Sequence, residues 1–545
     1  MTLELPAWHV TTLDELLQLP TLISVAKRLT NDALLSPEEQ AVIDQYPAQV
    51  GDDLVALVRA AILDSTDPLG AAYCAIRTPV QRRSFGQTFT PVEAVIGMFG
   101  WANAQGQVAR IVDPGAGTGR YVLHGLRQNS RAIGVASEMD PLLALLLRAN
   151  ATVLGVDDRL DIRIGDFRAL QLEPIEGRTL FIGNPPYVRH HDIAPDWKSW
   201  YSDSLKSLGH ASSKLAGLHL HFFVKTLALA RPGDLGCYIT AAEWLDVNYG
   251  QSMRDMMTNG LGGRAVFVVS PEVPIFGDAL VSACITCFEP GSTSDNIEFR
   301  TLESAEQLLD LTGGHLANKN IARTERSWSI LLRNRPVVHN EQFIDLGTLF
   351  KVSRGQVTGK NNVWVTADNR FGIPERFLVP TITDASEIIQ AAGRIADLNG
   401  LRKVIALPSN LETLDENEQW PIQEFLDWAR TENADRGWIA EHRKPWWRVD
   451  MSKPAPQIVV TYMGRRPPVF AVNTAGARII NVAHGLYPRM PLEQDLVEQL
   501  VAWLNMNVSQ DAGRVYAGGL TKFEPSEVAR IRVPGAELLA QGALF

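Results

Sequence analysis

Short runs of apolar and β-branched residues alternate with helix-capable stretches between residues 105 and 290. Strands that alternate with helices are joined by crossover connections, which produce a parallel sheet with helices on both of its faces. This pattern constrains the chain more than any other and predicts an α/β fold. The predicted strands are 108–112, 133–136, 162–164, 179–182, 236–240, 265–269 and 282–288.

The regions on either side have different patterns. Apolar residues recur every three to four positions in residues 1–70, which predicts helices that end at the turn signal 67–70. Residues 290–340 are polar and lack strand alternation, so we expect a connector. Short strands (457–461, 469–472, 478–481) and a helix (492–506) then predict a separate α+β domain. The predicted boundaries are 1–70 for the helical extension, 71–300 for the α/β domain, 301–340 for the linker and 341–545 for the last domain.

The composition of the 545-residue chain is that of an ordinary globular protein, with 46% hydrophobic and 21% charged residues. Four cysteines are too few for a disulfide scaffold and indicate a reduced, intracellular setting. The sequence has no stretch of roughly 18 uncharged apolar residues that would span a membrane, and no secretory signal pattern. The net charge of −10 argues mildly against a nucleic-acid partner unless basic residues gather locally.

A glycine-rich turn follows the first predicted strand, where residues 113–119 read Asp-Pro-Gly-Ala-Gly-Thr-Gly and lead into a helix. Glycine lets the backbone approach a ligand, and a helix N-terminus offers free N–H groups. The next two strands end at Glu138 and at Asp166-Phe167, and open α/β sheets bind ligands beyond such carboxyl ends. Each carboxylate alone is equally well a helix cap or a solvated residue. Together they predict a nucleotide-type cofactor, and Gly-x-Gly-x-Gly favours S-adenosylmethionine over NAD without deciding between them.

The motif Asn184-Pro185-Pro186-Tyr187 directly follows the fourth predicted strand. The two prolines fix the backbone and remove two donors, so the carbonyls of Asn184 and Pro185 become rigid acceptors. An asparagine carbonyl and a backbone carbonyl can together accept both hydrogens of an exocyclic amine, and Tyr187 offers a flat face for stacking on a base. Read alone, the tetrapeptide is a strand-terminating turn. Placed after a cofactor turn, it predicts a site for a planar amine.

These motifs in this order resemble the class I S-adenosylmethionine-dependent DNA adenine-N6 methyltransferases. More narrowly, they resemble the gamma group of type II restriction–modification systems, in which the cofactor motifs precede the catalytic motif and a target-recognition domain comes last. The resemblance covers about residues 80–290 and returns near the C-terminus. It implies a Rossmann-like, mostly parallel seven-stranded sheet with helices on both faces, followed by an α+β target-recognition domain.

The resemblance also implies roles for individual residues. The segment 85–91 is similar to the motif that encloses the methionine part of the cofactor, and the segment 274–276 to one that packs an aromatic ring on a flipped adenine. The implied catalytic residues are Asn184, Pro185, Pro186 and Tyr187, and the implied base-stacking residues are Tyr187 and Phe276. The implied cofactor-binding residues are Thr90, Pro91, Asp113, Gly115, Gly117, Gly119, Glu138, Asp166, Phe167 and Asn184.

Cationic and aromatic residues interleave between residues 441 and 470, which is typical of nucleic-acid binding. A solvated basic face with core tryptophans is the alternative on composition alone. The resemblance, which includes residues 347–361, 442–447 and 518–523, favours DNA. The expected DNA-binding residues are Arg443, Lys444, Trp446, Arg465, Arg466 and Lys522.

The implied partners are S-adenosylmethionine and double-stranded DNA, in the cytoplasm of a bacterium or archaeon. We expect a separate cognate restriction endonuclease, because residues 1–80 and the linker contain no convincing nuclease motif, and the sequence is compatible with a monomer. We expect no metal, because the Cys-x-x-Cys pair Cys284 and Cys287 lies in a predicted strand and would face opposite sides. His190-His191 and His219-x-His221 also lack companion ligands.

Three alternatives remain open from the sequence. The same tetrapeptide clamp suits a methyltransferase for RNA guanine N2 or for a protein glutamine amide, although such enzymes lack a recognition domain of some 200 residues like 340–545. A non-catalytic DNA-binding specificity subunit with a relic cofactor fold is a rival from a different class. A methyltransferase–nuclease fusion is the third.

Overall fold

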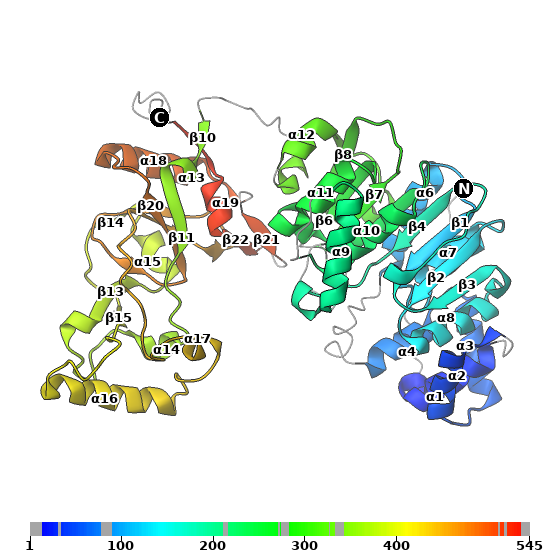
Figure 1. Cartoon of the computed structure of the whole chain (residues 1–545), viewed down its shortest axis with the longest axis horizontal. Helices are drawn as coiled ribbons and strands as arrows, with labels where there is room; N and C mark the ends of the chain where they lie inside the picture. The colour runs from blue at the N-terminus through cyan, green and yellow to red at the C-terminus, as the bar shows by residue number, and fades with distance from the viewer. Residues whose placement is uncertain are drawn as a thin grey trace. The chain divides into compact units, whose positions relative to one another are not determined.

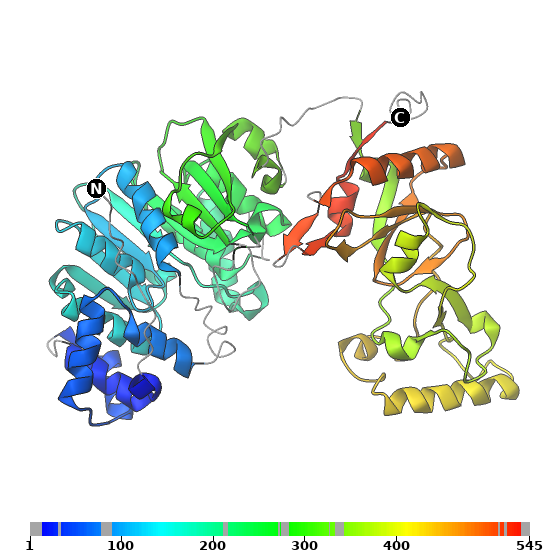
Figure 2. The same cartoon turned by 180° about the vertical axis from the view of Figure 1, so that it is seen from behind.

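The structure, a computed structural model, describes residues 14–30, 34–77, 90–210, 216–270, 273, 283–325, 327–332, 343–510, 513–516 and 520–535. The chain divides into two compact units, residues 1–335 and 336–545 (Figures 1 and 2). They are called the first and the second unit below.

A nine-stranded sheet forms the centre of the first unit, with the order β3-β2-β1-β4-β5-β7-β6-β8-β9. Neighbouring strands from β3 to β5 are parallel, whereas β7 runs antiparallel to both β5 and β6. This confirms the predicted mostly parallel sheet and its strands. Their bounds are β1 Arg110–Pro114, β2 Ile133–Glu138, β3 Leu160–Ile164, β4 Thr179–Gly183, β5 Leu235–Ala241, β6 Gly263–Val269 and β7 Ala283–Phe288.

Helices cover both faces of this sheet, as predicted (Figure 1). Alternate strand residues point to opposite faces, so Ile111 and Ile182 pack beneath α6 and α7, whereas Phe181 and Tyr238 pack beneath α10 and α11. The two apolar layers hold the carboxyl ends of the strands in fixed positions. The helix bounds are α6 Val92–Ala104, α7 Arg120–Gln128, α8 Pro141–Val153, α9 Pro195–Ser207, α10 Leu218–Leu229 and α11 Gln251–Thr258.

The structure corrects two expectations. The N-terminal helices do not end at the turn 67–70, because Asp67 caps the start of a further helix, α4 (Pro68–Ile76). Residues 290–340 are also not a connector without strands. Strands β8 (Asn296–Leu302) and β9 (His315–Asn318) extend the sheet beyond β6. They are followed by helix α12 (Lys319–Thr324) and a short 3₁₀ turn, in which Trp328 is fully buried and donates Nε1–H to the Ala322 carbonyl (2.8 Å). The predicted linker 301–340 is therefore wrong for the residues described within it. Ile297 and Phe299 face one apolar layer and Leu302 faces the other, while Glu298 and Arg300 are partly exposed, so this segment looked polar overall.

The helices before residue 77 pack on α8 of the sheet domain. Their apolar residues form one core with Leu142, Leu143, Leu145 and Leu146 of that helix. Arg148 of α8 also donates Nε–H to the buried carboxylate of Glu39 (2.8 Å). The helix bounds are α1 Leu19–Leu29, α2 Pro37–Gln45, α3 Asp52–Leu63 and α4 Pro68–Ile76.

The two cysteines of the Cys-x-x-Cys pair and the two histidines of α10 are buried in the first unit. Cys287 lies in the apolar layer beneath α6 and α7, and Cys284 lies in the opposite layer, which confirms that they face opposite sides. His219 and His221 are buried in α10, where the His221 ring stacks on Tyr201 with centroids 4.4 Å apart. Among the described residues, no three His, Cys, Asp or Glu side chains are grouped so that they could hold a metal. None of the described helices has the length and apolar character needed to cross a membrane.

The second unit is an α+β domain, as predicted, built from small sheets. Its main sheet has the order β11-β20-β16-β18-β14, and smaller sheets have the orders β12-β15-β13-β19, β17-β22-β21 and β10-β23. The strand bounds are β10 Phe343–Asp345, β11 Phe350–Arg354, β12 Val365–Thr366, β13 Leu378–Ile382, β14 Arg394–Ile395, β15 Lys403–Ile405, β16 Ile458–Thr461, β17 Met463–Gly464, β18 Phe470–Asn473, β19 Arg478–Ile479, β20 Ala483–Pro488, β21 Arg514–Tyr516, β22 Leu520–Lys522 and β23 Arg532–Pro534. The helices are α13 Leu346–Leu349, α14 Asn361–Trp364, α15 Ala385–Gln390, α16 Glu416–Thr431, α17 Trp438–Glu441, α18 Gln494–Asn507 and α19 Pro525–Ala529.

Candidate functional site

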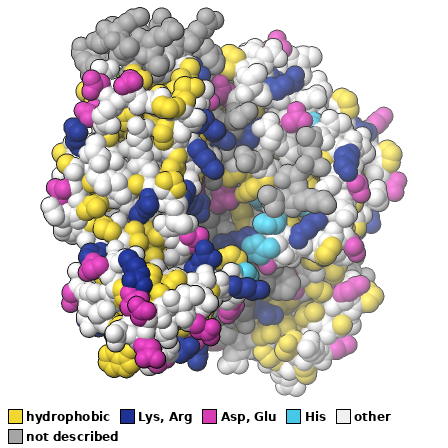
Figure 3. Space-filling model, turned by 60° about the vertical axis from the view of Figure 1, so that its left-hand side comes forward, with side chains coloured by type: hydrophobic (Ala, Val, Ile, Leu, Met, Phe, Trp, Pro, Cys, Tyr) yellow, Lys and Arg dark blue, Asp and Glu magenta, His cyan; other side chains and the backbone are white. Residues whose placement is uncertain are grey.

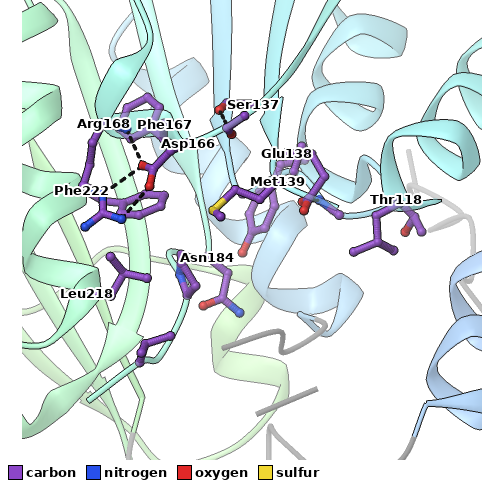
Figure 4. A pocket seen from close by; sticks show the side chains of 18 of the residues that line it. Thr118, Ser137, Glu138, Met139, Asp166, Phe167, Arg168, Asn184, Leu218 and Phe222 are labelled. Carbon is purple, nitrogen blue, oxygen red and sulfur yellow. Dashed lines mark hydrogen bonds and ion pairs between the residues drawn. The ribbon is translucent and has the colours of Figure 1, made fainter. Parts of the chain in front are cut away.

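A cavity of about 250 Å³ lies beyond the carboxyl ends of β1, β2, β3 and β4 (Figure 4). Its walls come from the turn after β1, the residues after β2 and β3, the loop after β4 and helix α10. The predicted site residues that line it are Thr90, Gly115, Gly117, Glu138, Asp166, Phe167, Asn184 and Pro186. The other predicted residues of the first unit that the structure describes, Pro91, Asp113, Gly119, Pro185 and Tyr187, do not line it. Phe276 lies outside the described residues, as does the segment 85–89.

Asp113 and Gly119 shape the glycine turn from behind the cavity. The Asp113 side chain is fully buried, and its Oδ2 accepts a hydrogen bond from the backbone N–H of Val122 in α7 (3.1 Å). Burial raises the pKa of this carboxyl to about 8. Gly119 has a φ of 91°, and a Cβ atom there would lie only 2.1 Å from Leu147 Cδ1 of α8. Both residues therefore hold the turn against the sheet and α8, while Gly115 and Gly117 face the cavity.

Glu138 joins the end of β2 to the glycine turn. Its Oε2 accepts a hydrogen bond from the Gly117 N–H (2.8 Å), and its Oε1 accepts one from the Asp140 N–H (3.0 Å). Burial raises the pKa of the carboxyl even though these hydrogen bonds oppose the shift. A carboxylate has about four acceptor positions, so Glu138 can hold the turn and still accept hydroxyl groups from a ligand in the cavity.

Arg168 lines the cavity and packs on Trp197, and neither residue was predicted from the sequence. The Arg168 guanidinium donates to both oxygens of Asp166 (2.9 and 2.5 Å; dashed lines in Figure 4) and lies 3.9 Å from the centroid of the Trp197 ring. Asp166 is thereby held in one orientation, beside the Phe167 and Phe222 rings, whose centroids are 5.1 Å apart. In the sequence, Arg168 stands two residues after Asp166, which could have indicated an ion pair. Trp197 comes from α9, so its contact with Arg168 could not be predicted from spacing.

Asn184 lines the same cavity from the loop after β4. Its Nδ2 donates to Thr90 Oγ1 (3.1 Å), and the Tyr121 hydroxyl donates to the same oxygen (3.1 Å). Because Nδ2 and Oδ1 lie on opposite sides of Cγ, the bond to Thr90 fixes the direction of the amide carbonyl. Figure 4 shows Asn184 and Glu138 on different strand ends around one cavity. The arrangement places a hydrogen-bond acceptor for an amine beside groups suited to a nucleoside.

Tyr187 lies next to this cavity, against α10 and β5. Its hydroxyl donates to the Ile239 carbonyl (3.4 Å), and its ring centroid is 6.3 Å from that of His219. Burial raises the pKa of the Tyr187 hydroxyl well above its usual range and lowers the pKa of His219 to about 4. Both side chains are therefore neutral at pH 7.

The neutral His219 should make the fold sensitive to acid. The unfolded chain binds a proton on this histidine below pH about 6.5, whereas the folded chain does so only near pH 4. Its contribution to stability is therefore complete above pH 6.5 and is lost as the pH falls toward 4, up to about 3 kcal/mol. We expect His219→Gln to lose less thermal stability than the wild type between pH 7 and pH 5, as measured by calorimetry. Equal losses in the two proteins would contradict this.

The residues predicted to bind DNA separate into two groups in the second unit. Arg443 donates to the carbonyls of Thr358 (2.9 Å) and Val357, and burial lowers its pKa. Trp446 lies beside the buried Trp364, with ring centroids 6.0 Å apart. These two residues hold loops together inside the unit. Lys444 is exposed.

The other group lies around the small sheet β17-β22-β21, where Met463 pairs with Lys522. Arg465 and Arg466 are exposed and line a hollow of about 340 Å³ together with Thr461, Met463 and Phe523. Lys522 pairs with Glu524 (2.5 Å) and lies 5.2 Å from the Tyr462 ring centroid. In Figures 1 and 2, α17 lies toward the end of the second unit that carries α16, whereas β22 lies nearer to α19.

The net charge of −10 is not concentrated on the surface drawn in Figure 3. On that face, Lys and Arg side chains are interspersed with Asp and Glu side chains.

The strand order, the antiparallel β7 and the cavity beyond the strand ends define the class I methyltransferase fold. The chain is similar to the type II methyltransferase M.XamI of Xanthomonas campestris pv. amaranthicola, with 46% identity over 455 residues that cover 83% of this chain and 86% of that protein. It therefore belongs to the type II restriction–modification methyltransferase family. The type II methyltransferase M.AccI of Acinetobacter calcoaceticus is 23% identical over 82% of this chain and 85% of its own length.

Family models agree with this assignment. The model described as "Eco57I restriction-modification methylase" matches residues 176–264, and "Type II methyltransferase M.Eco57I, C-terminal domain" matches residues 331–544. By contrast, the release factor glutamine methyltransferase of Cereibacter sphaeroides matches over 95 residues, or 17% of this chain.

Among solved structures, the type IIL restriction–modification enzyme MmeI in complex with DNA has a similar fold. Its TM-score is 0.55 at 13% identity, covering 96% of this chain and 78% of that one. A nuclease-deletion mutant of the type ISP enzyme LlaGI in complex with a DNA substrate mimic has a TM-score of 0.51 at 10% identity, covering 90% of this chain and 58% of that one. These two likenesses concern the fold.

Proposed function

We propose that this protein transfers a methyl group from S-adenosylmethionine to N6 of an adenine in double-stranded DNA, as a gamma-group enzyme of a type II restriction–modification system. One observation carries the proposal: the Asn184 amide lines the same cavity as the glycine turn, Glu138 and Asp166-Phe167. A protein glutamine is less well supported as the methyl acceptor, because the match to the release factor glutamine methyltransferase covers only 17% of this chain.

The residues around the cavity suit S-adenosylmethionine. Glu138 keeps acceptor positions for ribose hydroxyls, Asp166 and the flanking Phe167 and Phe222 rings suit an adenine, and Gly115 and Gly117 allow close approach of the methionine part. When bound, this cofactor supplies a methyl carbon activated by a positively charged sulfur. Asp113 and Gly119 contribute indirectly in this proposal, because they fix the turn.

Asn184 and Pro185 act on the amine of the target base. In a duplex, N6 faces the pairing partner, so the adenine must be rotated out of the helix. The Asn184 Oδ1 and the Pro185 carbonyl would then accept the two amine hydrogens and direct the nitrogen lone pair at the methyl carbon. Positive charge develops on nitrogen during transfer, so fixed acceptors stabilise the transition state more than the ground state. Tyr187 and Phe276 hold the base in this proposal.

Methylation assays on three substrates test the proposal. The purified protein is incubated with radiolabelled S-adenosylmethionine and duplex DNA, ribosomal RNA or release factor, and labelled nucleosides are identified by mass spectrometry. We expect label in N6-methyladenine from duplex DNA alone. Label in the RNA or the release factor, or in cytosine, would contradict the assignment. Sequencing of the methylated DNA would then give the target site, which a separate endonuclease would share.

We assign DNA recognition to the second unit, and within it to Arg465 and Arg466 rather than to Arg443 or Lys522. Exposed cations can reach phosphates or base edges. Arg443 already donates to two carbonyls, and Lys522 is largely buried and pairs with Glu524. Lys444 remains a further candidate because it is exposed. Arg465 and Arg466 line a hollow in the surface, where their guanidinium groups would contact the edge of a DNA groove.

Variants of Arg465 and Arg466 on the one hand and of Arg443 on the other distinguish DNA binding from a role in stability. We expect Arg465→Ala plus Arg466→Ala to weaken binding of duplex DNA by at least about 30-fold, since each of the two lost contacts is worth about 1–3 kcal/mol. Thermal stability should change little. Arg443→Ala, the matched control, should lower the unfolding temperature instead, because Val357 and Thr358 lose their donor. Binding is measured by fluorescence anisotropy at several salt concentrations, and equal DNA affinity of the double variant and wild type would contradict the assignment.

A further inference from the structure

We infer that Asp67 is a positioning residue that couples the N-terminal helices to the cofactor turn and, through Arg120 and Thr90, to Asn184. The inference rests on the proposed function, because it concerns the same cavity. It assigns to residues before the sheet domain a part in cofactor binding and catalysis rather than in packing alone. The contacts that carry it form a continuous path of hydrogen bonds.

Asp67 directs most of its hydrogen bonds away from its own helix. The carboxylate is buried, with 6% of the residue exposed, and one oxygen accepts the Gly70 N–H at the start of α4 (2.9 Å). The other oxygen accepts from Thr118 Oγ1 (2.7 Å) and from Arg120 Nε (3.1 Å), which belong to the glycine turn and the first position of α7. Capping α4 needs only the first of these bonds. The second oxygen therefore serves the turn.

Arg120 passes this contact on to the catalytic motif. Its guanidinium also donates to the Thr90 carbonyl (3.0 Å), and Thr90 Oγ1 accepts from Asn184 Nδ2 (3.1 Å). Thr90, Thr118, Arg120 and Asn184 all line the cavity, whereas Asp67 does not. One buried carboxylate outside the cavity is thus joined to both ends of the site, the turn that would hold the methionine part and the amide that would hold the base.

The charge of Asp67 matters because Arg120 is largely buried. The Arg120 side chain is 22% exposed and that of Asp67 is 3% exposed. A buried guanidinium without its carboxylate loses a charge-assisted bond and tends to move toward water. Such a movement would release Thr90, and with it the fixed direction of the Asn184 amide. An asparagine at position 67 has nearly the same shape, so it tests the charge rather than the packing.

A second contact from α4 reaches the other side of the cavity. The buried Tyr73 hydroxyl donates to Asp140 Oδ2 (3.1 Å), and the Asp140 N–H donates to Glu138. Helix α4 therefore touches the groups that follow β1 and those that follow β2. Both contacts come from one helix, so a displacement of α4 would change the two halves of the cofactor site together.

The pair Glu39–Arg148 provides a matched control in the same interface. It is also a buried carboxylate–arginine bond between the N-terminal helices and the sheet domain (2.8 Å), but it joins α2 to α8. Neither residue lines the cavity or contacts the glycine turn. If burial of an ion pair in this interface were all that mattered, loss of either carboxylate would affect the cofactor site equally.

The experiment compares Asp67→Asn and Glu39→Gln in the full chain. Calorimetry measures the dissociation constant of S-adenosylhomocysteine, thermal unfolding measures stability, and steady-state methylation gives kcat and KM. We expect Asp67→Asn to weaken S-adenosylhomocysteine binding about tenfold, to raise the KM for S-adenosylmethionine similarly, and to lower kcat with an unchanged KM for DNA. Glu39→Gln should keep the dissociation constant within about twofold of wild type, whatever its unfolding temperature.

Wild-type affinity in Asp67→Asn, or an equal weakening in Glu39→Gln, would overturn the inference while leaving the proposed function intact. Failure of the wild-type protein itself to bind S-adenosylhomocysteine would overturn both. If Asp67→Asn does not fold, Thr118→Val removes one donor to the same carboxylate. It should then weaken binding about threefold, and unchanged affinity would overturn the inference.

Discussion

Replacing Asn184 with alanine should lower methyl transfer by about 100- to 1,000-fold, the usual cost of removing one preorganised transition-state contact. The alanine lacks the carbonyl that would accept an amine hydrogen, and Thr90 loses the Nδ2 donor that fixes the loop after β4. Single-turnover methylation of duplex DNA measures the effect on the chemical step. Binding of S-adenosylhomocysteine and of DNA should remain within about threefold of wild type, because most of the cavity is unchanged.

Asn184→Asp gives the matched control. It keeps an acceptor oxygen but loses the Nδ2 donor and adds a charge, so it should retain more activity than the alanine variant at low pH, where the carboxyl is protonated and can donate to Thr90. Turnover by Asn184→Ala equal to wild type would show that the amine is held by other groups. Loss of S-adenosylhomocysteine binding in the same variant would instead indicate a role in the cofactor site.

Replacing Glu138 with alanine should abolish measurable cofactor binding at ordinary concentrations. A hydrogen bond to a charged group contributes about 1.5–3 kcal/mol, so loss of two hydroxyl contacts should raise the dissociation constant of S-adenosylhomocysteine by at least about 100-fold. The Gly117 and Asp140 N–H groups also lose their acceptor. Calorimetric titration with S-adenosylhomocysteine measures this directly.

Glu138→Gln separates the charge of Glu138 from its shape, and Asp161→Asn is a control outside the cavity. Glu138→Gln keeps one acceptor for the Gly117 N–H, so it should fold like the wild type and show a smaller loss of affinity than alanine. Asp161→Asn removes a carboxylate that is half exposed on the neighbouring strand β3 and does not line the cavity. It should bind S-adenosylhomocysteine normally. Normal binding by Glu138→Ala would exclude Glu138 from the proposed ribose site.

The sequence predicted the sheet because its signals are local. Buried strands followed by a turn can be recognised within ten residues, and the order of Asp113–Gly119, Glu138, Asp166 and Asn184 along the chain places them at one sheet edge by topology alone. Strand β8 was missed because Glu298 and Arg300 alternate with its apolar residues Ile297 and Phe299. A search for alternation rather than for apolar runs would have found it.

The parts that the sequence could not predict depend on contacts between distant segments. Trp197 lies on Arg168, and Arg443 donates to Thr358 and Val357, which precede it by 85 and 86 positions of the chain. Composition made Arg443 look like a ligand for phosphate, because a sequence shows charge but not whether the charge already has an internal partner. Asp67 was read only as part of a turn signal, because its contacts with Thr118 and Arg120 span more than 50 positions of the chain.

The division of the chain at residue 335 has an evolutionary consequence. Every residue that lines the cofactor cavity comes from positions 90–222, and the exposed arginines at 465 and 466 belong to the other unit. Under the proposed function, exchange of the segment that encodes the second unit would change the DNA target and leave the residues of the cavity unaltered. A hybrid gene made in this way would then give a new methylation pattern with the same chemistry.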